Sequence, residues 1–273
     1  TTGSTFQLQS ADVGHAGDYV ISATFSHATD PLVLDGGING QAQVIQRSTL
    51  MLLGGAFAFL DRFEAGARVP LYLQDGAAAG DRTMMFTADP ASGAAMGDIT
   101  LHGKARLWKH GGAAIATGLQ LTIPTAAKDS FTGTEKPSLR AIAIGSLTPD
   151  TLEHRIALTG HFGGVARAKS EFANIEQGSG MTWGIGASVH ALDRMWLSAE
   201  MFGDLLPAAR KATATTGAVS LSPIEWLAGL RYAPDHRFNI GLAFGRGLTS
   251  AAGSPSLRGV LELIKAADYR GPH

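Results

Sequence analysis

The feature that most constrains the fold is an alternation of apolar residues with period two, which recurs along the whole chain. Between residues 63 and 74, an apolar residue stands at every second position, and the positions between are mostly polar, charged or small. The same pattern recurs over 99–108, 224–232 and 238–244. Because successive side chains of a strand point to opposite faces, each segment predicts a strand with one apolar face. No segment shows a convincing helical pattern, which indicates an all-β chain.

About twelve segments of this kind follow one another, each roughly 9–12 residues long. Ordinary globular strands are shorter, at about 5–6 residues, whereas a tilted strand needs about 9–11 residues to cross a bilayer. The expected strands are 18–26, 47–59, 62–74, 98–109, 113–123, 138–147, 152–162, 181–190, 195–204, 223–232, 237–246 and 256–264.

The connections between these segments alternate in length. Short connections stand at 60–61, 110–112, 148–151, 192–194 and 233–236, and longer ones at 27–46, 75–97, 124–137, 163–180, 205–222 and 247–255. Short periplasmic turns and longer extracellular loops are typical of bacterial outer-membrane barrels. The sequence therefore predicts an N-terminal periplasmic segment (1–17), a transmembrane antiparallel up-and-down β-barrel (18–264) and a periplasmic tail or linker (265–273).

Composition narrows the class further. Charged residues make up 16% of the chain, against about 25% in an average soluble domain. The formal net charge of −1 provides no field for a nucleic-acid partner, and the absence of cysteine excludes a disulfide scaffold. The longest apolar run, 50–60, is too short to span a bilayer as a helix. We therefore expect the outer face of the barrel to contact outer-membrane lipid.

A soluble sandwich or lipocalin-like barrel remains an alternative, because alternation alone does not say which face is inside. Two arguments favour the membrane. One face of many strands carries small and charged residues where a soluble protein would be richer in Lys and Glu, and twelve strands enclose a lumen that aliphatic side chains fill poorly. A closed barrel also pairs every backbone group within lipid.

Charges of both signs are expected on the inward face. Opposite charges in a confined, partly dry space favour ion pairs, so we expect a lumen filled by side chains and water. The rival hypothesis is an anion-preferring channel, because the bases outnumber the acids. By the count of alternate positions, Trp108 and Trp196 also face inward. The predicted luminal charge network consists of Glu64, Arg68, Lys104, Arg106, Arg140, Arg155, Glu200, Glu225, Arg231, Arg258 and Glu262.

No motif for catalysis or for a cofactor stands out. The chain has neither a zinc-protease helix motif nor a phosphate-binding loop. Ser188 and His190 stand two residues apart, but on the expected luminal face, where they could not attack a membrane lipid. His102 and His161 lie on non-adjacent predicted strands, which does not suit a metal site. We therefore expect no enzyme activity, no catalytic residue, no cofactor and no metal.

Several short segments resemble, in order, the N-terminal barrels of OmpA-family proteins from myxobacteria and their relatives. They span roughly 31–263 and comprise 68–74, 97–99, 123–125 with 129–133, 222–229, and 247–249 with 253–258. The resemblance implies a periplasmic OmpA-like domain after the barrel that holds peptidoglycan, and a role for some members in cell–cell recognition and outer-membrane exchange. The chain departs from the family at its last strand, where Ile264 and Lys265 stand in place of an aromatic residue.

The function expected from the sequence is therefore structural. The barrel would anchor an OmpA-like envelope protein in the outer membrane of a Gram-negative bacterium, and its loops would contact a surface protein partner, as in cell adhesion. The alternative is a passive channel, a porin for small solutes.

Overall fold

The computed structural model describes most of the chain, and every regular element that it describes is a β-strand. No helix in the described residues is long and apolar enough to cross a membrane. The described residues are 5–35, 41–76, 92–127, 130, 132–149, 156–172, 175–206, 209–210, 222–249, 251 and 253–266.

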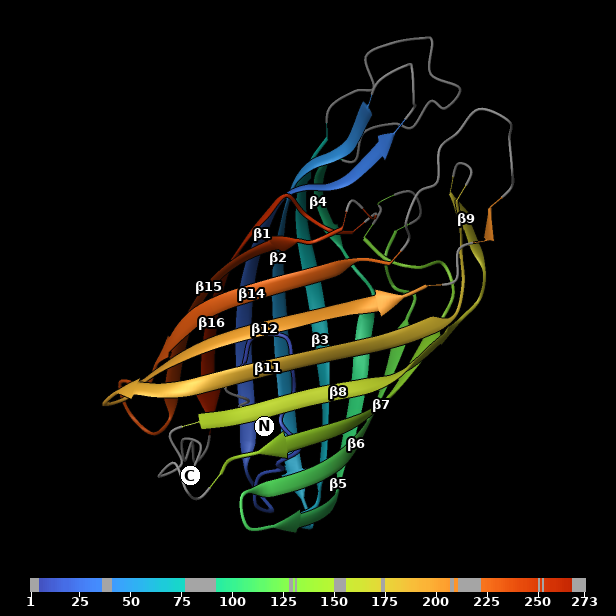
Figure 1. The fold of residues 1–273 in the computed structure, drawn as a ribbon. Helices are drawn as coiled ribbons and strands as arrows, with labels where there is room; N and C mark the ends of the chain where they lie inside the picture. The colour runs from blue at the N-terminus through green and yellow to red at the C-terminus, as the bar shows by residue number, and fades with distance from the viewer. Residues whose placement is uncertain are drawn as a thin grey trace.

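Twelve long antiparallel strands form one closed barrel (Figure 1). Each pairs with its neighbours in the ring, and the pairing of β1 with β16 closes the circle. The predicted fold is therefore confirmed, as is its place in the bacterial outer membrane. The ring runs β1 (Tyr19–Asp35), β2 (Gln41–Phe59), β3 (Phe63–Asp75), β5 (Ile99–His110), β6 (Ala113–Ile123), β7 (Ser138–Leu147), β8 (Ile156–Arg167), β11 (Gly180–Leu192), β12 (Met195–Leu205), β14 (Ile224–Tyr232), β15 (Phe238–Gly247) and β16 (Leu257–Ala266).

The alternation seen in the sequence separates the outside of the barrel from its lumen. On β15, Phe238, Ile240, Leu242 and Phe244 point outward and are 40–60% exposed, whereas Asn239 on the opposite face is 2% exposed. In a membrane, these outward apolar side chains contact lipid. The inward face carries the small and charged residues, so the arrangement is the reverse of a soluble barrel.

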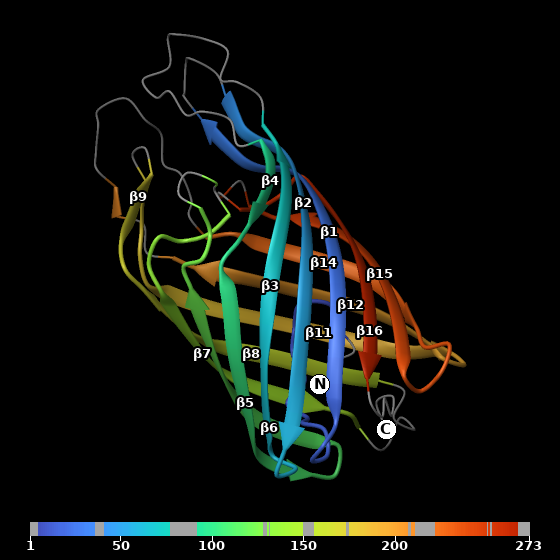
Figure 2. The same cartoon turned by 180° about the vertical axis from the view of Figure 1, so that it is seen from behind.

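Strand bounds agree with the predictions to within a few residues, except in the first hairpin. β1 and β2 continue to Asp35 and from Gln41, well into the region 27–46 expected to be loop. The extension bends away at a register shift after Thr29, where Asp30 has φ +50°, and it rises above the barrel at the end opposite the short turns (Figure 2). Short additional strands lie in the longer connections: β4 (Gly93–Met96), β9 (Ser170–Phe172), β10 (Ile175–Gln177) and β13 (Ala209–Arg210).

Pro70 does not interrupt β3, although proline cannot donate a hydrogen bond to the sheet. On one side it faces Leu52 of β2 in regular register. On its other side the ladder passes from β5, which pairs with residues 63–68, to β4, which pairs with 71–74. The Pro70 carbonyl accepts a hydrogen bond from the Gly97 N–H at this junction, at 2.9 Å. The N–H group that proline lacks is therefore absent at the point where the partner of β3 changes from β5 to β4.

The prediction that Trp108 faces the lumen is wrong. The register between β5 and β6 shifts between Arg106 and Trp108, and the extra residue reverses the side on which later residues lie. Trp108 consequently points outward and is 49% exposed. Trp196 lies on the inward face, where it packs against a small cluster of Ala233 and Ala266.

Candidate functional site: the lumen and its N-terminal segment

A segment of the chain lies inside the barrel. Residues 5–13, here called the luminal segment, form hydrogen bonds with side chains of strands around the inner wall. This differs from the periplasmic position expected for 1–17, because the lumen supplies the polar partners that an unpaired extended backbone needs.

One carboxylate holds the beginning of the luminal segment. The side chain of Glu200 on β12, which is 4% exposed, accepts hydrogen bonds from the backbone N–H groups of Phe6, Gln7 and Leu8 at 3.1–3.2 Å. Such bonds to a charged acceptor are stronger than neutral ones. Arg231 on β14 donates a hydrogen bond to the Thr5 carbonyl at 2.6 Å and lies over the Phe6 ring, with its guanidinium carbon 4.6 Å from the ring centroid.

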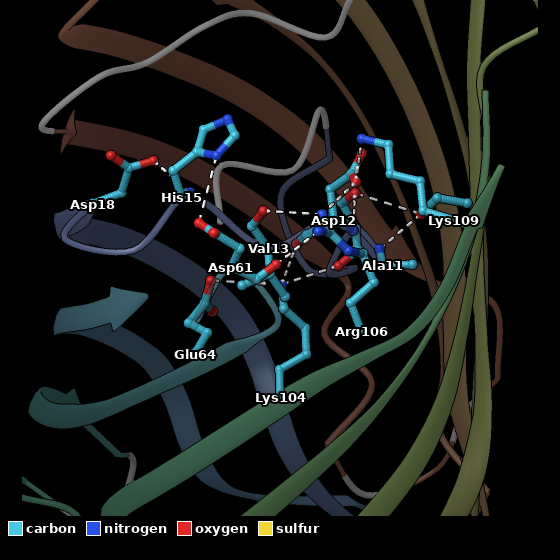
Figure 3. A network of polar contacts seen from close by, with 12 residues as sticks. Ala11, Asp12, Val13, His15, Asp18, Asp61, Glu64, Lys104, Arg106 and Lys109 are labelled. Carbon is cyan, nitrogen blue, oxygen red and sulfur yellow. Dashed lines mark hydrogen bonds and ion pairs between the residues drawn. The ribbon is translucent and has the colours of Figure 1, made fainter. Parts of the chain in front are cut away.

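The remainder of the segment is held from several other strands. Lys104 on β5 donates to the carbonyls of Ser10 and Asp12 at 3.1 and 2.8 Å. The Ser146 hydroxyl on β7 accepts from the Ala11 N–H at 2.8 Å, and the Thr159 hydroxyl on β8 donates to the Gln9 carbonyl at 3.1 Å. Figure 3 shows how Lys104, Arg106 and Lys109 converge on residues 11–13. The segment is therefore tied to the wall along its length.

Small inward residues create the space that the segment occupies. Leu8 lies against Gly184 and Gly186 of β11, where an added Cβ would stand 2.4 and 2.7 Å from its methyl carbons. Ala11 is fully buried in a cluster with small and aliphatic residues of β6 and β7, including Ala114 and Ala116. The segment therefore packs by shape as well as by hydrogen bonds.

A short turn leads from the luminal segment back to the start of β1. Gly17 has φ +97°, which favours glycine, and its N–H donates to the Ala58 carbonyl at 3.0 Å. The Asp18 carboxylate accepts from the His15 N–H at 2.8 Å, and Asp61 accepts from the Ala16 N–H at 2.7 Å. These contacts join the segment's exit to the β2–β3 turn.

Most of the predicted luminal charges form ion pairs. Lys104 and Glu64 are 3.6 Å apart and nearly inaccessible, Arg231 pairs with Glu262, and Arg258 binds Glu225 through two hydrogen bonds of 2.8 and 3.2 Å. Two further bases pair with aspartates that the prediction did not include. Arg106 lies 3.6 Å from Asp12, and Arg140 lies 3.6 Å from Asp204. Arg155 lies outside the described residues, and Glu200 binds the luminal segment instead of a base.

A cavity of about 130 Å³ remains between the luminal segment and one part of the wall. Its charged lining consists of Arg68, Lys104 and Arg231 with Glu64 and Glu262, and His102 stands beside them. The facing wall of β1 and β2 contributes small residues, among them Ser22, Gly54 and Ala56. The cavity is thus lined by charged side chains on one side and by small side chains on the other.

The luminal segment has only weak signs in the amino-acid sequence. Residues 5–13 carry too few apolar residues for a spanning strand, and no residue pattern in them predicts a position inside the barrel. Its partners Lys104, Ser146 and Thr159 belong to strands far apart in the chain, so only the closed barrel brings them together. Hydroxyl residues on an inward face, next to alanines and glycines, were the one available signal.

Neither a nucleophile pair nor a metal cluster forms among the described residues. The Ser188 hydroxyl is buried and has no hydrogen-bond partner, and His190 instead stacks on Trp196 at 5.0 Å. No group of three or more His, Asp or Glu side chains in the described part of the chain could hold a metal ion.

Asp98, which directly precedes β5, organises the loop after β6. Its carboxylate is 7% exposed and accepts hydrogen bonds from the backbone N–H groups of Thr125, Ala126 and Thr134 at 2.5–3.0 Å, and from the Thr134 hydroxyl. Gly133 must be glycine here, because a Cβ would stand 2.4 Å from an Asp98 oxygen. Asp98 therefore has a structural role in fixing this loop.

The fold resembles those of outer-membrane barrels of known structure. An outer membrane channel from Pseudomonas putida F1 matches with a TM-score of 0.70 at 12% identity, covering 96% of this chain and 100% of that one. The KdgM porin matches with a TM-score of 0.52 at 10% identity, covering 90% and 98%. No family model matches the sequence, and no curated protein matches it. At such identities the likeness establishes the fold, and these neighbours are named as channels and porins, not as enzymes.

Proposed function

We propose that this protein is a channel of the outer membrane for small solutes, in which the luminal segment limits the passage. The observation that carries the proposal is the charged, incompletely filled lumen. A barrel that served only as a support gains nothing from buried charges beside a cavity, because burying ions is costly. The cavity nevertheless lies among five charged side chains.

The neighbours support the same proposal. The outer membrane channel from Pseudomonas putida F1 is similar over nearly the whole of both chains, and the KdgM porin has also been solved in complex with disordered oligogalacturonate. Both support the porin alternative of the sequence analysis more than its main expectation of a membrane anchor.

The platform role is the second candidate, and the occupied lumen is the observation that favours it. Residues 5–13 fill much of the interior, which suits a barrel that does not conduct. The expected OmpA-like peptidoglycan domain and the contacts with a surface partner belong to this candidate. They remain proposals based on the sequence resemblance.

Single-channel recording in planar bilayers separates the two candidates. We expect the purified, folded barrel to give discrete conductance steps, smaller than those of wide general porins because the segment occupies the lumen. Gel mobility before and after boiling confirms that the barrel is folded. A folded barrel that inserts but gives no steps at any voltage would refute the channel and leave the platform.

A further inference from the structure

The cavity beside the luminal segment has an unusual charge balance. Its lining holds the guanidinium groups of Arg68 and Arg231, the ammonium group of Lys104 and two carboxylates. Glu64 pairs with Lys104 at 3.6 Å, and Glu262 pairs with Arg231. Within the described part of the chain, Arg68 forms no ion pair. A guanidinium stays charged in proteins, so the cavity carries one positive charge in excess.

Glycines leave room for polar side chains around the cavity. A Cβ on Gly66 would overlap the His102 ring at 2.6 Å, and a Cβ on Gly54 would stand 2.8 Å from the Ser22 hydroxyl. His102 and Ser22 line the cavity together with Arg68.

The ring of His102 is a second polar group beside the cavity. Among the described residues, the buried His102 Nδ1 has no hydrogen-bond partner. A buried nitrogen without a partner is costly, and a polar group entering the cavity would supply one. Arg68 provides a charged guanidinium with several N–H donors, and His102 provides an adjacent ring nitrogen.

We propose that this cavity binds a small monocarboxylate, with Arg68 as its charged anchor. One excess positive charge matches a monoanion, and the planar guanidinium matches a carboxylate with two parallel hydrogen bonds. Phe6, Leu8 and Leu52 also line the cavity and suit a short alkyl body. A volume of about 130 Å³ is close to that of engineered cavities that hold benzene, which limits the body to a few carbons.

This inference rests on the proposed channel function in one respect, namely that the bound anion is a solute in transit. Binding can be tested without conduction. Saturation-transfer NMR with sodium butyrate, and with butyramide as its uncharged analogue, reports contact with the folded barrel in detergent micelles. We expect transfer to butyrate and little to butyramide.

The variants identify the site. Arg68→Gln should weaken butyrate binding about tenfold or more, the loss typical of removing a charged hydrogen-bond partner, and Arg68→Lys should retain part of it. The matched control is Arg140→Gln, which removes a luminal cation that does not line the cavity and should leave binding unchanged. Unaltered gel mobility shows that each variant is folded.

The results separate the two proposals. Equal transfer to butyrate and butyramide, or undiminished binding by Arg68→Gln, overturns the carboxylate site whether or not the barrel conducts. Butyrate binding that depends on Arg68 in a barrel without conductance upholds the site and refutes the channel. When both hold, millimolar butyrate should reduce the chloride current of the wild type and not that of Arg68→Gln.

Discussion

The two halves of the luminal wall are built from similar residues and yet differ in what covers them. The covered wall, β6 to β12, carries inward alanines, glycines and hydroxyls and is occupied by the luminal segment. The open wall, β16 and β1 to β3, also carries small residues, including Gly54 and Ala56, but faces the cavity. Small side chains therefore provide space on both walls, and the polar groups beside them decide what occupies it.

On the covered wall, the neighbouring polar groups are acceptors and donors aimed at a peptide backbone. Glu200 accepts from consecutive N–H groups, and Ser146 and Thr159 reach single backbone atoms. On the open wall, Arg68 and the carboxylates of Glu64 and Glu262 place charges beside the cavity. This comparison indicates that the luminal segment is specified by hydrogen bonding along one wall, whereas charged side chains line the cavity along the other.

Removing the luminal segment should have the largest effect on the difference between the covered wall and the open wall. Deletion of residues 1–13 exposes the covered wall to water, so single-channel conductance should rise severalfold over the wild type, measured in planar bilayers under the same salt. The barrel should still form, because none of the described strand pairings involves residues 5–13. Unchanged conductance in a folded deletion variant would show that the segment does not limit the passage.

Weakening the main hold on the segment should have the next largest effect. Glu200→Gln replaces charged acceptors for three N–H groups, and hydrogen bonds to charged groups contribute about 1.5–3 kcal/mol each. Amide exchange at residues 6–8 should accelerate about tenfold or more, read by hydrogen-exchange mass spectrometry. The matched control is Glu225→Gln, whose carboxylate binds Arg258 instead. Equal acceleration in both variants would contradict a specific hold by Glu200.

Filling the space behind Leu8 should loosen the segment more modestly. A valine at Gly184 meets Leu8 at a Cβ distance of 2.4 Å, and overpacking of this kind costs about 1–3 kcal/mol. Conductance should become noisier, with brief openings to the level of the deletion variant. Gly145→Val provides the control, because no atom lies within 4 Å of a Cβ there. Stable wild-type steps in Gly184→Val would argue against packing by Leu8.

The smallest effect is expected at the periplasmic β14–β15 turn, outside both walls. Hydrogen bonds from the N–H of Arg237, and then from that of Phe238, lower the pKa of Asp235 below its ordinary value of 3.8. A lowered pKa in the folded state stabilises the turn above pH 3.8, and this stabilisation is lost as the pH falls through the lowered pKa.

Amide exchange at Arg237 and Phe238, corrected for intrinsic rates, should therefore lose protection only in strong acid. Asp235→Asn should remove this pH dependence and leave conductance unchanged. A conductance change in that variant would mean that the turn also affects ion flow through the lumen. The turn could then no longer be treated separately from the luminal walls.

Much of the fold was accessible from the sequence, because lipid outside and a polar lumen inside impose strict alternation. β15 shows this most clearly, since its exposed and buried residues alternate without a break. The expectation for Trp108 failed because a single inserted residue in β5 shifts the register, and nothing in the local composition marks that position. The first hairpin was longer than expected, since β1 and β2 pair beyond the residues that the alternation marked.

The site was only partly predictable. Inward charges such as Arg231 and Glu262 follow from the period of their strands, and opposite charges in a narrow lumen pair. The partners of Arg106 and Arg140, Asp12 and Asp204, depend on which strands and segments face one another across the barrel. That information is absent from the period of any one strand.

The sequence by itself determined that the chain forms a closed outer-membrane barrel, because a period of two over long segments has few other stable solutions. It also determined which residues face inward, except after the register shift in β5, where Trp108 points outward. Only the tertiary structure decided what lies in the lumen. The luminal segment is hydrogen-bonded by side chains from five strands. Within the described residues Arg68 forms no ion pair, because its neighbouring carboxylates pair with Lys104 and Arg231. Both outcomes depend on distances across the barrel, which exist only once the sheet has closed.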